Sequence, residues 1–370
     1  MTFSSSWPAC SFSGWPYIAM SESGCCHGPN PLPTGWRSAT LALVLDKPGV
    51  DERLLTAEVA DAWATNLVDL EFMPVGLDGQ AWAYRIVTAE GRRYFLKLRR
   101  GQFTQAAVLL PGFLRAQGIG QVVAPIERPT GATGHQWGDY QLLLYPFHEG
   151  GSLWSRGLTD RQWVEYGEFL GRLHAVTPSA DIAAVLRVET YQSTANERLR
   201  ALGAQAADSE ALGAFWERYG PALHRLSDTV DELAARVTTA EHVICHADIH
   251  PGNLLAESDG PLYVVDWDAP ILAPRERDLM FVYSHDFGDH PINEHRAELF
   301  RRGYGPAEPD QTLLGYYRSE RHLDDVASFL AGVLNPDAGA ESRANDLHWL
   351  TRIAAAVADP NYAASCCRLA

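Results

Sequence analysis

Two polar segments dominate this 370-residue sequence: HADIHPGN at residues 246–253 and DWD at residues 266–268. Each follows directly on an apolar run, VIC before the first and LYVV before the second, which predicts two short buried strands that end at these side chains. A carboxylate in such a place is costly to bury unless a cation or hydrogen-bond donors meet it. A magnesium ion and the hydroxyl group of a small molecule are suitable partners.

The residue types in these segments suit phosphoryl transfer. The transition state of that reaction spreads negative charge over oxygen atoms, so a protein mainly positions the reactants and supplies cations. Magnesium prefers oxygen ligands, which Asn253 and Asp266 would provide. Asp248 has the remaining position, from which it would orient an attacking hydroxyl and accept its proton.

The phosphates also need a cation from elsewhere in the chain, and Lys97 is the candidate. The sequence holds 30 lysines and arginines, of which only Lys47 and Lys97 are lysines. Arginine thus serves almost wherever a positive surface charge suffices, and a lysine inside the apolar run 93–98 needs a reason. We predict that Lys97 holds the α- and β-phosphates of ATP. The alternative is a solvated lysine on an edge strand.

The hydrophobic pattern before these segments predicts a small sheet lobe. Residues 1–48 are rich in Ser, Gly, Pro and Cys without periodicity, which is typical of a disordered leader. From Asp51 onward, apolar residues recur at helical spacing. A second helix-like run, 104–117, then lies among strand-like runs at 70–75, 81–88, 93–98, 122–126 and 140–145.

After residue 146 the pattern becomes mainly helical, beginning with the capping-box sequence TDRQ at 159–162. We therefore expect an α+β protein with two lobes. Residues 49–145 would form a small nucleotide-binding lobe with a five-stranded antiparallel sheet and one helix. Residues 146–370 would form a larger, mainly helical lobe that carries the catalytic loop and the substrate site.

At this point the sequence resembles the aminoglycoside phosphotransferase and choline kinase superfamily. The catalytic loop of that superfamily has the form H-x-D-x-x-x-x-N, followed by a strand and a magnesium-binding Asp. The residues that match this order and spacing are His246, Asp248, Asn253 and Asp266. The resemblance covers roughly residues 55–330. It implies a protein-kinase-like two-lobed fold with ATP in the cleft.

Further runs match the family. The resemblance implies that Tyr145 and Phe147 flank the backbone that receives adenine, and that Asp278 braces the catalytic loop. We expect His246 and Asp268 to support the site, His246 through hydrogen bonds, since Asp248 already fills the role of base. Runs similar to the spectinomycin phosphotransferase branch in particular lie at 266–270, 273–281, 303–305 and 316–321.

One expected feature is missing. Kinases of this type pair the strand lysine with a Glu on the following helix, but residues 104–117 contain no acid. Gln105 would take that place as a neutral hydrogen-bond partner. The missing acid also keeps open a pseudokinase that binds nucleotide without turnover.

The charge balance favours a small cationic acceptor over nucleic acid. A formal net charge of -16 and a pI near 5.2 leave no excess of basic residues to neutralise a phosphate backbone. Residues 281–330 hold nine acids against five arginines. Candidate ligands for an ammonium group in that stretch are Asp286, Glu320 and Asp324, and the alternative for each is a solvated helix face.

The remaining features indicate a cytoplasmic protein. No run approaches the ~20 apolar residues of a membrane helix, and the N-terminus lacks the pattern of a secretory signal. The six cysteines show neither a disulfide framework nor the spacing of a zinc site. We expect no membrane partner, and the sequence leaves the oligomeric state open.

Two other kinds of function stay open beside an ATP- and magnesium-dependent kinase of an aminoglycoside or aminocyclitol hydroxyl. A metal-dependent hydrolase would use the compact set His246, Asp248 and His250 as ligands. A kinase of choline or of a sugar would keep the same catalytic residues and differ only in the acceptor.

Overall fold

The computed structural model of the protein describes residues 47–75, 80–238, 240–283, 292–306, 308–360 and 362. Of the predicted leader, residues 1–46 lie outside these ranges. So do five of the six cysteines, and the sixth, Cys245, is a buried free thiol. No helix within the described ranges is long and apolar enough to span a lipid bilayer.

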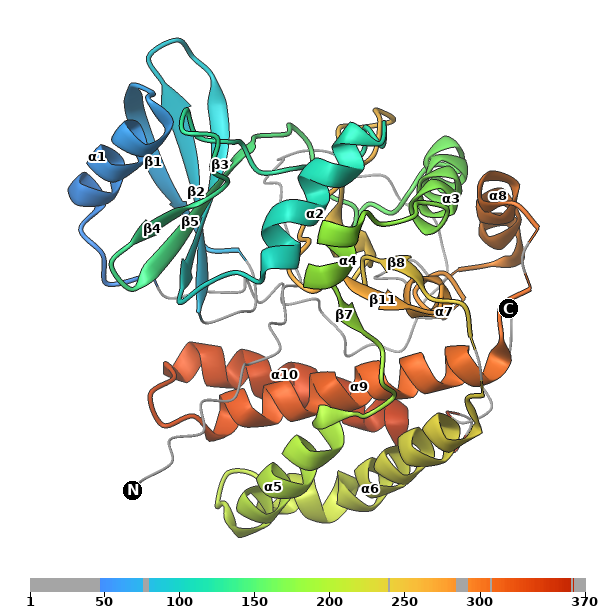
Figure 1. Ribbon diagram of the computed structural model, residues 1–370. Helices are drawn as coiled ribbons and strands as arrows, with labels where there is room; N and C mark the ends of the chain where they lie inside the picture. Colours follow the sequence, from blue (N-terminus) through green and yellow to red (C-terminus); the bar gives the residue numbers. More distant parts are fainter. Residues whose placement is uncertain are drawn as a thin grey trace, which may run out of the picture.

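A five-stranded antiparallel sheet forms the small lobe (Figure 1). In spatial order its strands are β1 (Leu67–Met73), β2 (Ala81–Thr88), β3 (Arg93–Arg100), β5 (Tyr140–Pro146) and β4 (His135–Trp137). The predicted α+β fold and the number of strands are confirmed. Besides the expected helix α2 (Gln105–Ala116), the helix predicted from Asp51 onward, α1 (Glu52–Trp63), also packs on the sheet.

One predicted strand is wrong. The run 122–126 stays outside the sheet: Val122 forms only an isolated bridge to Val264 of the larger lobe, and the Ile126 amide donates to the Leu144 carbonyl at 2.6 Å. The run is apolar because it lies buried where the two lobes meet. The short polar segment His135–Trp137 supplies the fifth strand instead.

The two faces of the sheet have different partners. Successive side chains of a strand point to opposite faces, so the buried Leu96 and Leu98 lie on one face, in a cluster with Leu55 and Val59 of α1. Lys97, between the two leucines, lies on the other face. Figure 1 shows α1 on the outer side of the sheet and α2 on the side that faces the larger lobe. The alternation of β3 thus directs the lysine toward the larger lobe.

The larger lobe is mainly helical, as predicted. Its first long helix begins at Thr159, where the predicted capping box is present. The helices are α3 (Asp160–His174), α4 (Ala180–Val185), α5 (Thr194–Asp208), α6 (Gly213–Arg236), α7 (Glu276–Leu279), α8 (Glu294–Tyr304), α9 (Gln311–Leu334) and α10 (Ala340–Val357).

Short strands carry the polar segments of this lobe, and both predicted strands are present. In chain order they are β6 (Gly151–Ser152), β7 (Arg187–Val188), β8 (Val243–Cys245), β9 (Leu254–Ala256), β10 (Tyr263–Val264) and β11 (Ile271–Ala273). They form two small sheets, ordered β10-β9-β6 and β7-β11-β8. A single 3-10 turn, Pro251–Asn253, precedes β9. The large sheet ends at Pro146, and β6 follows only a few residues later. Because β6 pairs with β9, this connecting segment is hydrogen-bonded to the strand that directly follows the loop at 246–253.

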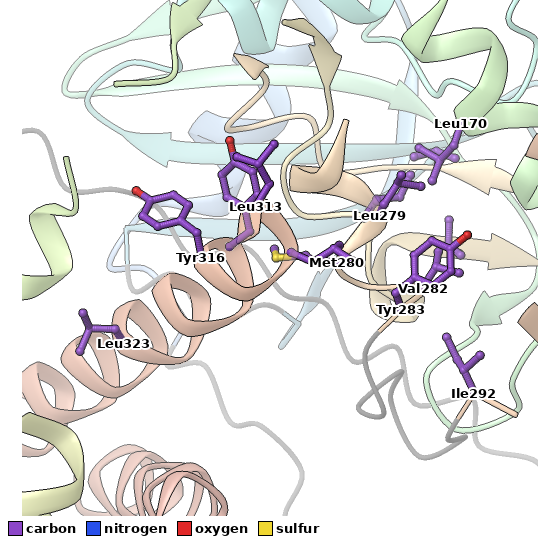
Figure 2. Packing of buried hydrophobic residues seen from close by; sticks show 14 of the residues in the cluster. Leu170, Leu279, Met280, Val282, Tyr283, Ile292, Leu313, Tyr316 and Leu323 are labelled. Atoms are coloured by element: carbon purple, nitrogen blue, oxygen red, sulfur yellow. The ribbon is translucent and has the colours of Figure 1, made fainter. Parts of the chain in front are cut away.

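A continuous apolar core holds the helical lobe together. Figure 2 shows Leu313, Tyr316 and Leu323 of α9 with Leu279 and Met280, which follow the second polar segment in the chain. Each of these side chains is at most 5 % exposed. The core therefore fixes the position of α9 relative to the strands that carry the polar residues.

Helices α3 and α8 cross at an unusually close distance, which two glycines permit. A Cβ atom at Gly303 would overlap the backbone carbonyl oxygen of Val164, and one at Gly167 would overlap that of Phe300. Both obstacles are backbone atoms of a neighbouring helix, so they cannot move aside as a flexible side chain can. The crossing depends on the absence of side chains at these two positions.

We expect Gly303→Ala to lower the free energy of unfolding by about 3 kcal/mol, because the added methyl must push the two helices apart. Gly112→Ala in α2 is the matched control. A Cβ there meets no atom within 4 Å, and Ala is favoured over Gly in a helix by about 1 kcal/mol. Thermal or denaturant unfolding of the two variants checks the prediction. Equal stability of the two proteins would contradict the close crossing.

Candidate active site

The sheet lysine meets the two aspartates that follow β10. The Lys97 Nζ atom lies 2.8 Å from Asp266 Oδ1 and 2.8 Å from Asp268 Oδ2, and no side chain of the three is more than 7 % exposed. Burial lowers the pKa of Lys97, but the two carboxylates raise it more, and the net pKa lies above the ordinary value. Lys97 is therefore a protonated cation in this site.

Asp268 supplies an acidic partner for Lys97, which the helix after β3 does not offer. It accepts a hydrogen bond from Lys97, and its backbone carbonyl accepts one from Thr104 Oγ1, the N-cap of α2, at 3.4 Å. Gln105 is exposed. The expectation that Gln105 is the partner of Lys97 is wrong, because Asp266 and Asp268, which follow β10, accept the hydrogen bonds of its ammonium group.

Asp278 holds the loop at residues 246–253. Its carboxylate accepts hydrogen bonds from the backbone amides of His246 at 2.9 Å and Ala247 at 2.7 Å. Ala247 has a left-handed backbone with φ of 71°, which is unfavourable for a residue with a side chain. His174 Nε2 lies 3.2 Å from the same carboxylate. Asp278 thus stabilises a strained turn directly before Asp248.

His246 bridges the two polar segments. Its Nδ1 accepts from the Asp248 amide at 3.3 Å, so its Nε2 carries the proton and donates to the Val265 carbonyl at 3.0 Å. Burial lowers the pKa of His246 below its usual value, which keeps the ring neutral. The side chain therefore positions the loop beside the strand end.

Asp248 is fixed from two sides. Asn253 Nδ2 donates to its backbone carbonyl at 2.8 Å and lies 3.4 Å from Oδ2, while Arg321 Nη1 of α9 contacts Oδ1. Burial raises the pKa of Asp248, but Arg321, followed by His250, outweighs it and the net pKa is lowered. The carboxylate is ionised and oriented.

The side chains of Asn253 and Asp266 suit magnesium by the chemistry of their donor atoms. Both are fully buried, and they offer an amide and a carboxylate oxygen, the hard ligands that the ion prefers. The backbone of Asp266 is left-handed, with φ of 67°, and in this conformation its carboxylate contacts Lys97.

The ligand set of a metal-dependent hydrolase does not converge. Within the described ranges, one trio of His, Cys, Asp or Glu has its ligand atoms within 4.8 Å of one another, and it is His174, Cys245 and Asp278. The set His246, Asp248 and His250 is not such a group.

A pocket lies beside Lys97, between the large sheet and strands β9 and β10. It brings the predicted adenine-flanking residues Tyr145 and Phe147 together with Lys97 and Asp266. The residues that line it are Phe95, Lys97, Val123, Tyr145, Pro146, Phe147, His148, Leu255, Val265 and Asp266. The lining thus combines aromatic side chains, which suit a flat ring, with the cation of Lys97.

The predicted substrate residues are already engaged with arginines. Glu320 lies 2.9 Å from Arg277 Nη1, and Asp324 lies 2.7 Å from Arg198 Nη1. Asp286 lies outside the described residues. Glu320 and Asp324 project from α9, the same helix that brings Arg321 to Asp248.

Sequence reasoning missed Arg321. The only signal was the run 316–321, which matched the resemblance without a role for any single residue. The spacing of Glu320, Arg321, Asp324 and Asp325 suggests helical charge pairs, but it does not indicate that the arginine reaches a loop 73 residues earlier in the chain.

Three comparisons with known proteins agree with this geometry. Residues 71–314 match the profile of a phosphotransferase enzyme family. The crystal structure of spectinomycin phosphotransferase APH(9)-Ia in complex with ADP and spectinomycin superposes with a TM-score of 0.75 and 28 % identity, over 84 % of this chain and 99 % of that one. Its AMP-bound complex superposes with a TM-score of 0.73 at 28 % identity, over 85 % and 97 % of the two chains. Protein StrN of Streptomyces griseus is 24 % identical over 295 residues, 74 % of this chain and 82 % of that protein.

Proposed function

Because residues 71–314 of its 370 match the family profile, the chain belongs to the phosphotransferase enzyme family, and we propose that it transfers the γ-phosphoryl group of ATP to a hydroxyl of a small cationic acceptor. The acceptor class we propose is an aminocyclitol antibiotic of the spectinomycin type. Residues 49–145 would bind the nucleotide, and residues 146–370 would carry the catalytic loop and the acceptor.

One observation carries the proposal. Lys97 reaches Asp266 at 2.8 Å across 169 residues of sequence. This pair lines a pocket that also holds aromatic side chains, and the ionised Asp248 lies in the loop before β9. A cation for phosphates, oxygen ligands for a metal and a carboxylate for a hydroxyl are the three parts that phosphoryl transfer requires.

In the proposed reaction the acceptor hydroxyl oxygen forms a bond to the γ-phosphorus of ATP. The bond from that phosphorus to the bridging oxygen breaks, and ADP leaves with the electron pair. The hydroxyl proton passes to Asp248 and then to solvent, so the products are a phosphate ester, ADP and a proton. Because the pKa of Asp248 is lowered, its main task is to orient the hydroxyl.

The other residues bind and position. Lys97 would move its ammonium from Asp266 to the phosphates and keep Asp268 as its partner. Asn253 and Asp266 would hold magnesium, which when bound supplies positive charge against the phosphate oxygens. Tyr145 and Phe147 would enclose the adenine ring.

The acceptor class rests on two supports. A protein with 28 % identity to this chain has been crystallised with ADP and spectinomycin. The second support is the charge of the chain as a whole, formally -16, which would attract an acceptor that carries ammonium groups. An ammonium group that binds Glu320 or Asp324 would replace the arginine with which each is paired.

The test is release of ADP by the purified full chain with ATP and magnesium, in the presence of spectinomycin, other aminoglycosides, choline or a simple sugar. Release that depends on an aminocyclitol supports the proposal. Release with choline or a sugar alone would replace the acceptor class. ATP binding without turnover of any acceptor would favour a pseudokinase.

The charge state of Asp324 gives a pH prediction. Burial, and then Glu320, raise the pKa of Asp324 to about 7, so near neutral pH this carboxyl is partly protonated. A cationic acceptor binds its ionised form, and binding must therefore weaken as the pH falls below that value. We expect the KM of the acceptor to increase several-fold from pH 8 to pH 6, and Asp324→Asn to flatten this dependence. An identical pH profile in the variant would remove Asp324 from acceptor binding.

A further inference from the structure

Arg321 contacts the Asp248 carboxylate, and no step of the proposed reaction uses it. Its Nη1 contacts Asp248 Oδ1, its Nε lies 3.2 Å from Asp325 Oδ1, and its guanidinium lies 5.6 Å from the centre of the Phe281 ring. The three charged side chains are between 13 % and 20 % exposed. The arginine thus links α9 to the catalytic loop in a largely buried place.

The contact leaves the two oxygens of Asp248 in different surroundings. Arg321 holds Oδ1, whereas Oδ2 lies 3.4 Å from the Asn253 amide nitrogen. Because Arg321 of α9 contacts one oxygen of this carboxylate and Asn253 of the loop lies next to the other, the carboxylate cannot rotate freely. The guanidinium of Arg321 is planar and its donor directions are fixed. The contact of its Nε with Asp325 therefore also sets the direction in which Nη1 points toward Asp248.

The neighbouring arginines do something different. Arg277 and Arg198 pair with Glu320 and Asp324, acids of α9 itself, and so join that helix to α7 and α5. The Arg321 pair instead extends from α9 to a residue of the catalytic loop. Packing of α9 alone does not require that contact, because the core already places the helix through Leu313 and Leu323.

We propose that Arg321 is a positioning residue for phosphoryl transfer: supported by Asp325, it holds the Asp248 carboxylate so that Oδ2 faces the acceptor hydroxyl. The proposal rests on the proposed function of this site. Arg321 acts through Asp248 and touches neither nucleotide nor acceptor. Its loss should therefore lower the rate of transfer and leave nucleotide binding in place.

The test compares Arg321→Gln, Arg321→Lys and Asp325→Asn in the full chain. Arg200→Gln is the control, because it removes an arginine from an exposed pair with Asp231. We expect Arg321→Gln to lower kcat about 100-fold, the loss typical of misplaced reacting groups, with the KM of ATP within twofold. Arg321→Lys should recover part of kcat, Asp325→Asn should lose less than Arg321→Gln, and Arg200→Gln should match the parent protein. A lowered melting temperature with unchanged kcat in Arg321→Gln would overturn the proposal, because the contact between Arg321 and Asp248 would then serve only stability.

Crystal structures of the parent protein and of Arg321→Gln with bound ADP separate this proposal from the proposed function. The Asp248 carboxylate should adopt one orientation in the parent protein and turn, or occupy two orientations, in the variant. An unchanged Asp248 side chain would overturn the role of Arg321, whichever acceptor is used. Failure of the parent protein to turn over any acceptor would instead contradict the proposed function.

Discussion

Asp248→Asn is expected to lower phosphoryl transfer by about 1,000-fold or more, because the amide cannot accept the hydroxyl proton and loses the charge that orients the hydroxyl. The replacement keeps the shape of the side chain, and the hydrogen bond from Asn253 Nδ2 to the backbone carbonyl of residue 248 remains. ATP should bind as before, since Asp248 is not among the residues that line the pocket proposed for the nucleotide. Coupled ADP release measures the first result, and titration with ATP measures the second.

A matched control for this change is Asp181→Asn, at an exposed position in the first turn of α4. It should transfer phosphate at the rate of the parent protein. The comparison separates loss of one carboxylate in the loop from a general effect of the substitution. Near-normal turnover by Asp248→Asn would remove this residue from the mechanism and leave the site without a group to orient the hydroxyl.

Lys97→Met is expected to lower both stability and turnover. It leaves Asp266 and Asp268 buried without their common cation, and loss of one partner from a buried ion pair costs about 3–5 kcal/mol. Turnover should fall below detection, because no other lysine lies in the described ranges apart from Lys47, which pairs with Glu52 at the surface. Denaturant unfolding and ADP release report the two losses separately.

The double variant Lys97→Met with Asp268→Asn distinguishes the causes. Removal of one of the two carboxylates relieves their repulsion, so the double variant should regain part of the unfolding free energy. It should stay inactive, since the cation for the phosphates is still missing. Equal stability of the single and double variants would mean that the two carboxylates do not share the charge of Lys97.

The fold could be predicted because most of its helices and strands are marked by patterns within their own stretch of sequence. The strand-like runs 81–88 and 93–98 predicted β2 and β3, and the capping box at Thr159 predicted the start of α3. The run 122–126 was misread because burial between two lobes makes a connecting segment as apolar as a strand. The short strand His135–Trp137 was missed because three residues are too few for a periodic pattern.

The site was predictable where chemistry fixes spacing along the chain. Asp248, Asn253 and Asp266 lie within one loop and the strand pair after it, and Lys97 was found because lysine is rare in this sequence. Partners that come from distant segments were not predictable. Asp268 for Lys97 and Arg321 for Asp248 depend on how the lobes and α9 pack, which no short stretch of sequence encodes.

The pairing of β6 with β9 has a mechanical consequence. Gly151 and Ser152 pair with Ala256 and Leu255, and the Leu153 amide lies within hydrogen-bonding distance of the Pro251 and Leu254 carbonyls. The segment that leaves the large sheet is thus hydrogen-bonded to the loop that holds Asn253, and we expect the two to move together. Residues 121–123 are likewise hydrogen-bonded to Val264, so a change in the angle between the lobes would have to come from twisting of the large sheet.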